Sequence, residues 1–401
     1  MAGRSWRYGL SRNLLLLGFV SLLTDVSSEM LFPLIPFFVI ALGGTALVVG
    51  VIEGAADSMS SLVKVFAGHA SDRTGRKKPY VVAGYGLSAI TKYFYPLVPG
   101  WPAFLGVRLT DRAGKGIRDP PRDVLIVEST PSDAVGKAFG FHRAMDTVGA
   151  ILGPILALVL LSVFFLGQSD LAAYRLVFAV AAIPATLAFA VALLVREIPR
   201  APRARPLRLS LSSLPPRLRA FILIASLYSF ANVSYAFLVL RAGQVQGTTV
   251  AIALYLVFNV VYAANATQAG GLSDRLGRFP VLIAGYSAFI GTAVIFVLFS
   301  TLAWFAVGFV LYGLSFALVE GVHRAVVSDL APPEVRGTAL GTYHMAVGLT
   351  KLPGGLVAGA LFVSALGYPA TFAFAAIGAA AALIALTALF VTSRPGREAA
   401  A

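Results

Sequence analysis

Twelve long apolar stretches restrict what this chain can fold into more than any other feature of its sequence. Each is long enough for the roughly 20 residues with which a helix spans a bilayer core. Only 12% of the residues are charged, against about 25% in an average soluble domain, so the chain cannot coat a soluble core. We expect an all-α integral membrane protein with transmembrane helices at 13–41, 45–68, 79–98, 101–128, 136–166, 173–195, 218–241, 248–271, 279–300, 302–329, 337–364 and 367–392.

The net charge of +14 orients the chain rather than forming a surface for nucleic acid. The even-numbered connections, both tails and the stretch between the two halves carry 20 Lys and Arg residues, whereas the opposite face carries only Arg175 and Arg241. By the positive-inside rule, both termini are expected in the cytoplasm. We expect a multi-pass protein of the cytoplasmic membrane, with the lipid bilayer as a partner and no nucleic acid.

The sequence repeats itself at half its length. The segment 68–76 (GHASDRTGR) returns as 270–278 (GGLSDRLGR), an offset of 202 residues, and a Pro/Gly pattern at 131–140 returns at 332–341. Six helices are therefore repeated in the same orientation, about an axis along the membrane normal. The predicted division is a six-helix bundle at 1–195, a cytoplasmic linker at 196–217 rich in Arg and Pro, and a second bundle at 218–401.

Over essentially the whole chain, this organisation resembles the major facilitator superfamily of secondary transporters. The two repeated segments resemble that family's loops between helices 2 and 3 and between helices 8 and 9. Glycines permit a tight turn, the aspartate can sit at a helix N-terminus, and the arginines can bridge to acidic groups. The resemblance implies a gate, and a plain glycine turn with orienting charges is the alternative. The gating candidates, with two carboxylates of helix 4, are Gly68, Asp72, Arg73, Gly75, Arg76, Asp274, Arg275, Gly277, Arg278, Asp119 and Asp123.

Two further motifs carry the resemblance. Arg112 with Gly116 is similar to the helix-4 pattern that the family associates with proton coupling, although Lys115 replaces the usual polar residue before the glycine. The run from Gly149 through Gly153 to Pro154 resembles the helix-5 motif of antiporters, in which small residues let helices approach closely. It implies export by exchange; a generic packing face of small residues is the alternative.

Charged residues inside the predicted helices point to a polar interior. A charge that faces lipid at a helix centre costs about 2.5–3.5 kcal/mol, so the many charges of helix 4 must be shielded. On helix 1, Asp25 and Glu29 share one face, and because like charges repel, one of the two should hold a proton part of the time. We expect proton coupling at Asp25, Glu29 and Arg112, with Glu53 and Asp57 of helix 2 as further candidates. A structural ion-pair network is the alternative.

The second half carries amphipathic groups instead of many charges. Spacings of three and four residues place two sets of tyrosines and asparagines on single helix faces, which suits a pocket for an organic ligand as well as ordinary packing. Two histidines and a carboxylate on helices 10 and 11 could ligate a metal, but we expect a polar gate there and no metal site. The substrate-binding candidates are Tyr228, Asn232, Tyr235, Tyr255, Asn259, Tyr262, Arg108 and Glu320.

These observations predict a proton-coupled antiporter that exports a small amphipathic organic compound as a monomer, without a cofactor. A metal ion, or an organic anion attracted by the cations of helix 4, is the alternative cargo. A sensor that binds a solute without moving it is a second alternative. No enzyme is expected, since the sequence holds no HExxH motif, nucleophile elbow or phosphate-binding loop.

Overall fold

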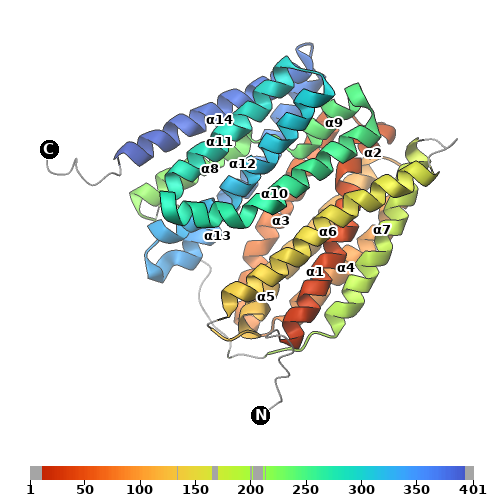
Figure 1. The fold of residues 1–401 in the computed structure, drawn as a ribbon. Coiled ribbons are helices and arrows are strands. Elements are labelled where there is room, and N and C mark those ends of the chain that lie inside the picture. The colour runs from red at the N-terminus through yellow and green to blue at the C-terminus, as the bar shows by residue number, and fades with distance from the viewer. Residues whose placement is uncertain are drawn as a thin grey trace. The chain divides into compact units, whose positions relative to one another are not determined.

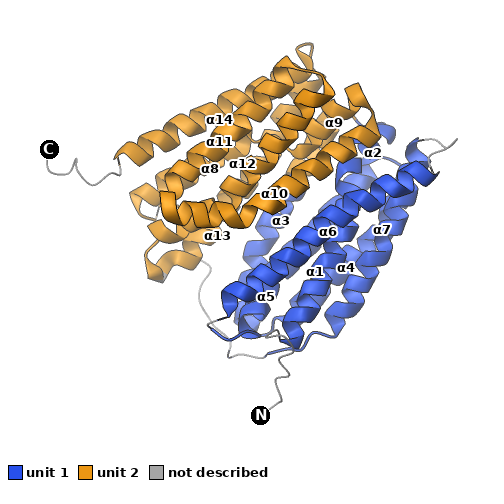
Figure 2. Ribbon diagram, in the orientation of Figure 1, with its two compact units in different colours: residues 1–44, 55–206 blue, residues 45–54, 207–401 orange. Residues whose placement is uncertain are grey.

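The computed structural model describes residues 11–132, 134–164, 170–198, 201, 211–212 and 214–392, and these residues form helices and no strand (Figure 1). Most of the predicted linker, 199–200, 202–210 and 213, lies outside the described residues. By packing, the chain divides into two compact units: unit 1 is residues 1–44 with 55–206, and unit 2 is residues 45–54 with 207–401 (Figure 2). Each unit is described by itself below.

The first half of the chain contains seven α-helices and two short 3-10 helices among its described residues. Pro33 and Pro36 divide the first predicted segment, so that a 3-10 turn separates α1 from α2. The elements are α1 (Arg12–Leu31), η1 (Phe32–Leu34), α2 (Ile35–Ala41), α3 (Ala46–Thr74), α4 (Lys78–Phe94), η2 (Tyr95–Leu97), α5 (Trp101–Glu128), α6 (Val135–Phe164) and α7 (Asp170–Leu193).

The second half repeats this order, including the break inside its first predicted segment. Asn232 leaves the helical conformation, and the Ser234 side chain caps a new helix, so the predicted helix 218–241 is two helices. The elements are α8 (Pro216–Ala231), α9 (Tyr235–Gln246), α10 (Thr248–Leu276), α11 (Arg278–Leu298), α12 (Leu302–Leu330), η3 (Pro333–Val335), α13 (Arg336–Val363) and α14 (Gly367–Thr392).

The helices have the lengths that the sequence predicts for membrane spans. Among the described residues, ten helical segments are long and apolar enough to cross a bilayer, and α1 with α2 and α8 with α9 each count as one. The remaining two expected segments are α4, which has 17 residues, and α5, which has eight charged residues between Arg108 and Asp123. The expected twelve-segment membrane protein is confirmed.

The same helix pairs pack in both units, as a repeated sequence requires. In unit 1, α1 packs on α6 and α7, and α4 packs on α5 and α7. In unit 2, α8 packs on α13 and α14, and α11 packs on α12 and α14. The repeated motif ends α3 and α10 in the same way: Gly75 (φ 67°) and Gly277 (φ 92°) adopt the left-handed conformation that favours glycine.

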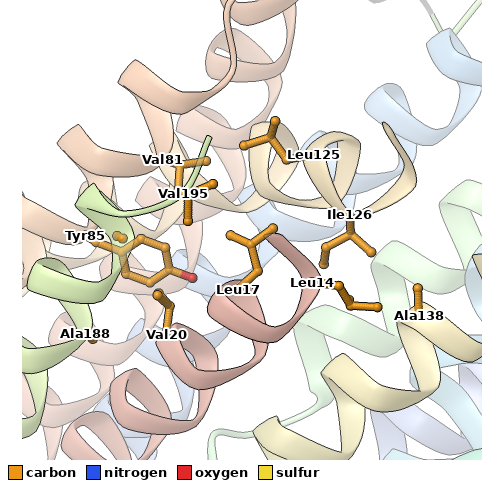
Figure 3. Close-up of a cluster of buried hydrophobic side chains, with 11 residues drawn as sticks. Leu14, Leu17, Val20, Val81, Tyr85, Leu125, Ile126, Ala138, Ala188 and Val195 are labelled. Atoms are coloured by element: carbon orange, nitrogen blue, oxygen red, sulfur yellow. The ribbon is translucent and has the colours of Figure 1, made fainter. Parts of the chain in front are cut away.

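The apolar core of unit 1 at one end of its helices comes from five of them. Eleven buried side chains from α1, α4, α5, α6, α7 and the residues that follow α7 meet there, and the Tyr85 ring lies among them (Figure 3). The cluster consists of Leu14, Leu17, Val20, Val81, Tyr85, Leu125, Ile126, Ala138, Ala188, Ala192 and Val195. It fixes the start of α1 and α4 against the end of α5 and α7.

Candidate transport site

The charged face of α5 is buried inside unit 1. Arg108 is 1% exposed, Asp111 5% and Arg112 7%, and Arg118 and Asp119 are also buried. These side chains lie on one face because residues three and four apart in a helix point in similar directions. The prediction that the charges of this helix are shielded is confirmed for these five side chains, which the protein buries.

One group of these charges surrounds Asp111, and we call it the Asp111 cluster (Lys92, Tyr95, Arg108 and Asp111). The carboxylate oxygen Oδ2 of Asp111 lies 3.5 Å from Lys92 Nζ and 3.9 Å from an Arg108 nitrogen, and it accepts a hydrogen bond from the Tyr95 hydroxyl at 3.2 Å. Lys92 is 1% exposed. Buried charges are tolerated when they are paired, so this cluster joins α4 to α5 electrostatically.

A second group lies about two helical turns further along α5, and we call it the Asp119 cluster (Lys64, Arg118, Asp119, Arg122 and Asp123). Lys64 Nζ of α3 lies 3.0 Å from Asp119, and Arg122 reaches Asp119 at 3.5 Å and Asp123 at 2.8 Å. Arg118 donates to Ser88 Oγ at 2.7 Å and lies over the Tyr85 ring. Asp119 and Asp123, predicted to act in gating, are therefore both ion-paired.

Arg112 and Lys115 lie between the two clusters and have no such partners. Among the described residues, neither side chain forms a hydrogen bond or an ion pair, and Arg112 Nε is fully buried. The Arg112 guanidinium stands 4.6 Å from the Phe32 ring centroid, a cation–π contact that Arg108 shares at 5.0 Å. Arg108, a predicted substrate-binding residue, is thus part of the Asp111 cluster, whereas Arg112 is left with an aromatic neighbour.

The predicted carboxylates of α1 lie beside the glycines of α6. A side chain at Gly149 would meet Asp25 Cβ, and one at Gly153 would meet Glu29 Cβ. The Asp25 carboxylate forms no hydrogen bond or ion pair within the described part of the chain. The charges that act most strongly on it belong to Asp146, Lys115, Glu29 and Arg118. Arg112, its expected responder, is not among these groups.

Asp146 of α6 is, like Asp111 of α5, a carboxylate that the sequence analysis did not select as a site residue. It accepts a hydrogen bond from the Ser21 hydroxyl of α1 and lies 3.5 Å from His142 Nδ1. Its distance of four residues from His142 was readable from the sequence, but the contact with Ser21 was not, because it joins two helices 125 residues apart.

The close contact of α1 with α6 predicts a large effect of one substitution. In Gly153→Val, the new Cβ would lie 2.6 Å from Glu29 Cβ and 2.8 Å from the Val26 carbonyl oxygen. Overpacking of this kind costs about 1–3 kcal/mol, so we expect a lower midpoint of thermal unfolding in detergent, measured by tryptophan fluorescence. Gly140→Val on the same helix is the control, since nothing lies within 4 Å of its added Cβ. Equal midpoints for the two variants would contradict the packing described here.

The two carboxylates of α3 are separated by the structure. Glu53, 4% exposed, accepts a hydrogen bond from the Tyr235 hydroxyl at 3.0 Å within unit 2. Asp57 belongs to unit 1, is exposed and forms no hydrogen bond or ion pair among the described residues. The proton-coupling role of both stays a prediction.

The tyrosines of unit 2 fall into two groups. Tyr228 is buried: its ring stacks on that of Tyr286 at 3.8 Å and its hydroxyl lies 3.1 Å from Ser315 Oγ. His323 lies in the same group, with Nε2 2.9 Å from the Tyr286 hydroxyl and Nδ1 3.1 Å from the Tyr343 hydroxyl. Tyr286, Tyr343 and Ser315 were missed because each lies on another helix without a motif of its own.

The second group follows α9 and α10. The rings of Tyr235 and Tyr255 lie 5.2 Å apart, and Phe258 stands between Tyr255 and Tyr262. The Tyr262 hydroxyl donates to Glu320, which lies 3.8 Å from Arg324. The predicted substrate residues Asn232 and Asn259 are buried near this group's helices. An aromatic face that ends in carboxylates at Glu53 and Glu320 can bind an amphipathic organic molecule.

The repeated motif differs in its partners between the units. In unit 1, Asp72 pairs with Lys77, while Arg73 and Arg76 are exposed and form no ion pair among the described residues. In unit 2, Arg278 binds Asp274 and reaches Asp329 of α12 at 3.0 Å. In unit 2, the expected ion pair from the motif to another helix therefore exists at Arg278. In unit 1, the motif's Asp72 pairs instead with Lys77, which lies just outside the motif.

No three His, Asp or Glu residues of the described ranges lie close enough together to hold a metal ion. Both ring nitrogens of His323 contact tyrosine hydroxyls. The Glu320 carboxylate accepts a hydrogen bond from Tyr262 and lies near Arg324. In this part of the chain His323 and Glu320 thus take part in packing and hydrogen bonding.

The comparisons with known proteins agree in family. The sequence profile of the Major Facilitator Superfamily matches residues 17–350 and 258–401. An uncharacterized MFS-type transporter of Methanocaldococcus jannaschii is 37% identical over 361 residues, which cover 88% of this chain and 89% of that protein. The multidrug resistance protein MdtH of Photorhabdus laumondii subsp. laumondii is 33% identical over 149 residues, 37% of each chain.

Solved structures share the fold at low sequence identity. A POT family transporter in complex with a thioalcohol conjugated peptide has a TM-score of 0.79 at 13% identity, covering 97% of this chain and 98% of that one. The nucleoside transporter NupG has a TM-score of 0.72 at 15% identity, with 95% and 99% covered.

Proposed function

The chain belongs to the major facilitator superfamily, and we propose that it is a proton-coupled antiporter that exports a small amphipathic organic compound across the cytoplasmic membrane. As a multi-pass transporter it binds a small-molecule substrate within the lipid bilayer. We propose that it works as a monomer, since the Asp111 cluster lies buried within unit 1 and the Tyr228 group lies buried within unit 2.

The observation that carries this proposal is that the Asp25 carboxylate forms no hydrogen bond or ion pair among the described residues. A carboxylate inside a membrane helix without a hydrogen bond or an ion pair is expensive when ionised. Here Lys115 and Arg118 attract it while Asp146 and Glu29 repel it. Uptake of a proton removes both forces, so protonation changes the attraction between α1 and α5. That change is what a carrier needs to couple proton binding to helix movement.

The cargo class rests on unit 2 and on the partial likeness to a multidrug resistance protein. The aromatic group of α9 and α10 offers ring faces, and Tyr235 and Tyr262 add hydroxyls that are bonded to carboxylates. A cationic cargo and a proton carry the same charge and compete for carboxylates. A cationic cargo at Glu53 or Glu320 would displace a proton bound to the same carboxylate, and such competition supports exchange.

An organic anion is the second candidate, and Arg112 with Lys115 favours it. Both cations lack a direct partner among the described residues, and Arg112 is buried. An anion bound here would be repelled by ionised Asp25 and would bind best when Asp25 holds a proton. Protons and an anionic cargo would then move in the same direction.

The test is a reconstitution in liposomes with a pH-sensitive dye inside, screened with naphthalene compounds that carry an ammonium, a neutral amide or a carboxylate on one skeleton. Proton movement opposite to the cationic or neutral compound supports the antiporter. Movement in the same direction as the carboxylate supports the second candidate. Binding of a compound without proton movement, while a proton ionophore still collapses the gradient, would overturn proton coupling and indicate a sensor or a uniporter.

A further inference from the structure

The five residues that follow α7, Leu194–Ile198, turn back onto the ends of other helices of unit 1. The Arg196 backbone N–H donates to Asn13 Oδ1 at 3.0 Å, and Asn13 Nδ2 donates to the Arg196 carbonyl oxygen at 3.0 Å. The same amide group also donates to Ser129 Oγ, 3.1 Å away, at the end of α5. One side chain at the start of α1 thus holds the chain after α7 and the end of α5 together.

Glu197 connects the segment to a second helix, α4. Its carboxylate accepts hydrogen bonds from the backbone N–H groups of Lys77 at 3.1 Å and Lys78 at 2.9 Å, at the start of α4. Helix N-termini leave backbone N–H groups unsatisfied and favour negative charge. The Lys78 ammonium group donates in turn to the Leu193 carbonyl oxygen at 2.9 Å. The start of α4 and the end of α7 are therefore joined in both directions.

Val195 places the segment in the apolar core. It is 1% exposed and belongs to the cluster that Leu14 of α1, Val81 of α4 and Ile126 of α5 share (Figure 3). A segment that only connects two bundles would not need to bury a side chain, to satisfy the backbone of α4 or to bond a side chain of α1.

We propose that Leu194–Ile198 is a clasp that stays closed during transport and fastens the end of α7 to α1, α4 and α5. Any displacement of Leu194–Ile198 then acts on the whole bundle, including α1 with Asp25, about 18 Å along the helix from Asn13. Lys77 extends the clasp to the gating motif, since its side chain binds Asp72 while its backbone binds Glu197. The inference does not depend on the cargo or on proton coupling.

The first arm of the test needs no cargo. Hydrogen exchange of the amides of Lys77, Lys78 and Arg196 is measured in wild type and in Glu197→Gln, with Asp170→Asn at the other end of α7 as the matched control. We expect slow exchange in wild type and in the control, and exchange of the Lys77 and Lys78 amides at least about tenfold faster in Glu197→Gln. Fast exchange of all three amides in wild type would overturn the clasp.

The second arm decides whether the clasp stays closed. The natural chain has no cysteine, so an Asn13→Cys, Arg196→Cys double variant can be bridged selectively with a short bifunctional methanethiosulfonate reagent and released with a reductant. We expect slow naphthalene-compound transport in the unbridged variant and recovery on bridging. If bridging the double variant stops transport, the segment must open during transport and the proposal is wrong. If the unbridged double variant transports at the wild-type rate, the contacts between Asn13 and Arg196 are unnecessary for transport, and the proposal is also wrong.

Discussion

Asp25→Asn is expected to reduce proton-coupled transport to the background of protein-free liposomes while the protein stays folded. The amide keeps the size of the carboxylate but cannot take up or release a proton. The attraction of Lys115 and Arg118 to this position therefore no longer changes with protonation. An unpaired charge inside a membrane helix is costly, and its removal should leave the midpoint of thermal unfolding unchanged or higher. Transport is measured with the dye-loaded liposomes, and folding by tryptophan fluorescence.

Asp170→Asn is the matched control for this variant. Asp170 is an exposed carboxylate at the first position of α7 and receives the same chemical change. We expect wild-type proton movement in the control. Proton movement of wild-type size in Asp25→Asn would remove Asp25 from the coupling site, whereas equal loss in both variants would show that the assay reports something other than this position.

Lys92→Met is expected to destabilise the protein by about 3 kcal/mol, the low end of the range for breaking a buried ion pair. The substitution leaves the Asp111 carboxylate buried without its ammonium partner at 3.5 Å. Tyr95 and Arg108 still contact Asp111, which keeps the effect from being larger. The midpoint of thermal unfolding in detergent measures the loss.

Lys64→Met provides the comparison on a neighbouring helix. Lys64 also pairs with a carboxylate of α5, at 3.0 Å, but its side chain is 35% exposed. Partly exposed pairs contribute about 0–1 kcal/mol, so this variant should unfold near the wild-type midpoint although its ion pair is shorter. A larger loss for Lys64→Met than for Lys92→Met would contradict the view that burial determines the importance of these pairs.

The fold could be predicted from the sequence because a bilayer demands long apolar helices and because the halves repeat. The helix breaks between α1 and α2 and between α8 and α9 were harder to predict. Pro33 gives a signal for the first break, but the break at Asn232 has neither glycine nor proline and depends on the Ser234 cap. The whole stretch Pro216–Gln246 is apolar enough to count as one membrane span, so the pattern predicted one helix where there are two.

The geometry around the candidate site could be predicted only in part, because the sequence points to single side chains but not to their partners on other helices. Periodicity places Arg112 and Lys115 on the buried face of α5 and Asp25 on α1, yet it does not say which charges meet. Lys92 and Tyr95 pair with Asp111 across helices, and Tyr228 packs on Tyr286 rather than lying beside Tyr235. Such contacts depend on helix rotation, which side-chain spacing along one helix leaves open.

Proton exchange on cargo binding tests the central claim most directly. The purified protein in weakly buffered detergent solution is mixed with the cargo identified by the liposome screen, and a pH indicator reports the protons released per molecule. The account predicts proton release from wild type on binding of a cationic or neutral cargo, and none from Asp25→Asn at saturating cargo. Equal release from both proteins would contradict the assignment of the coupling proton to Asp25.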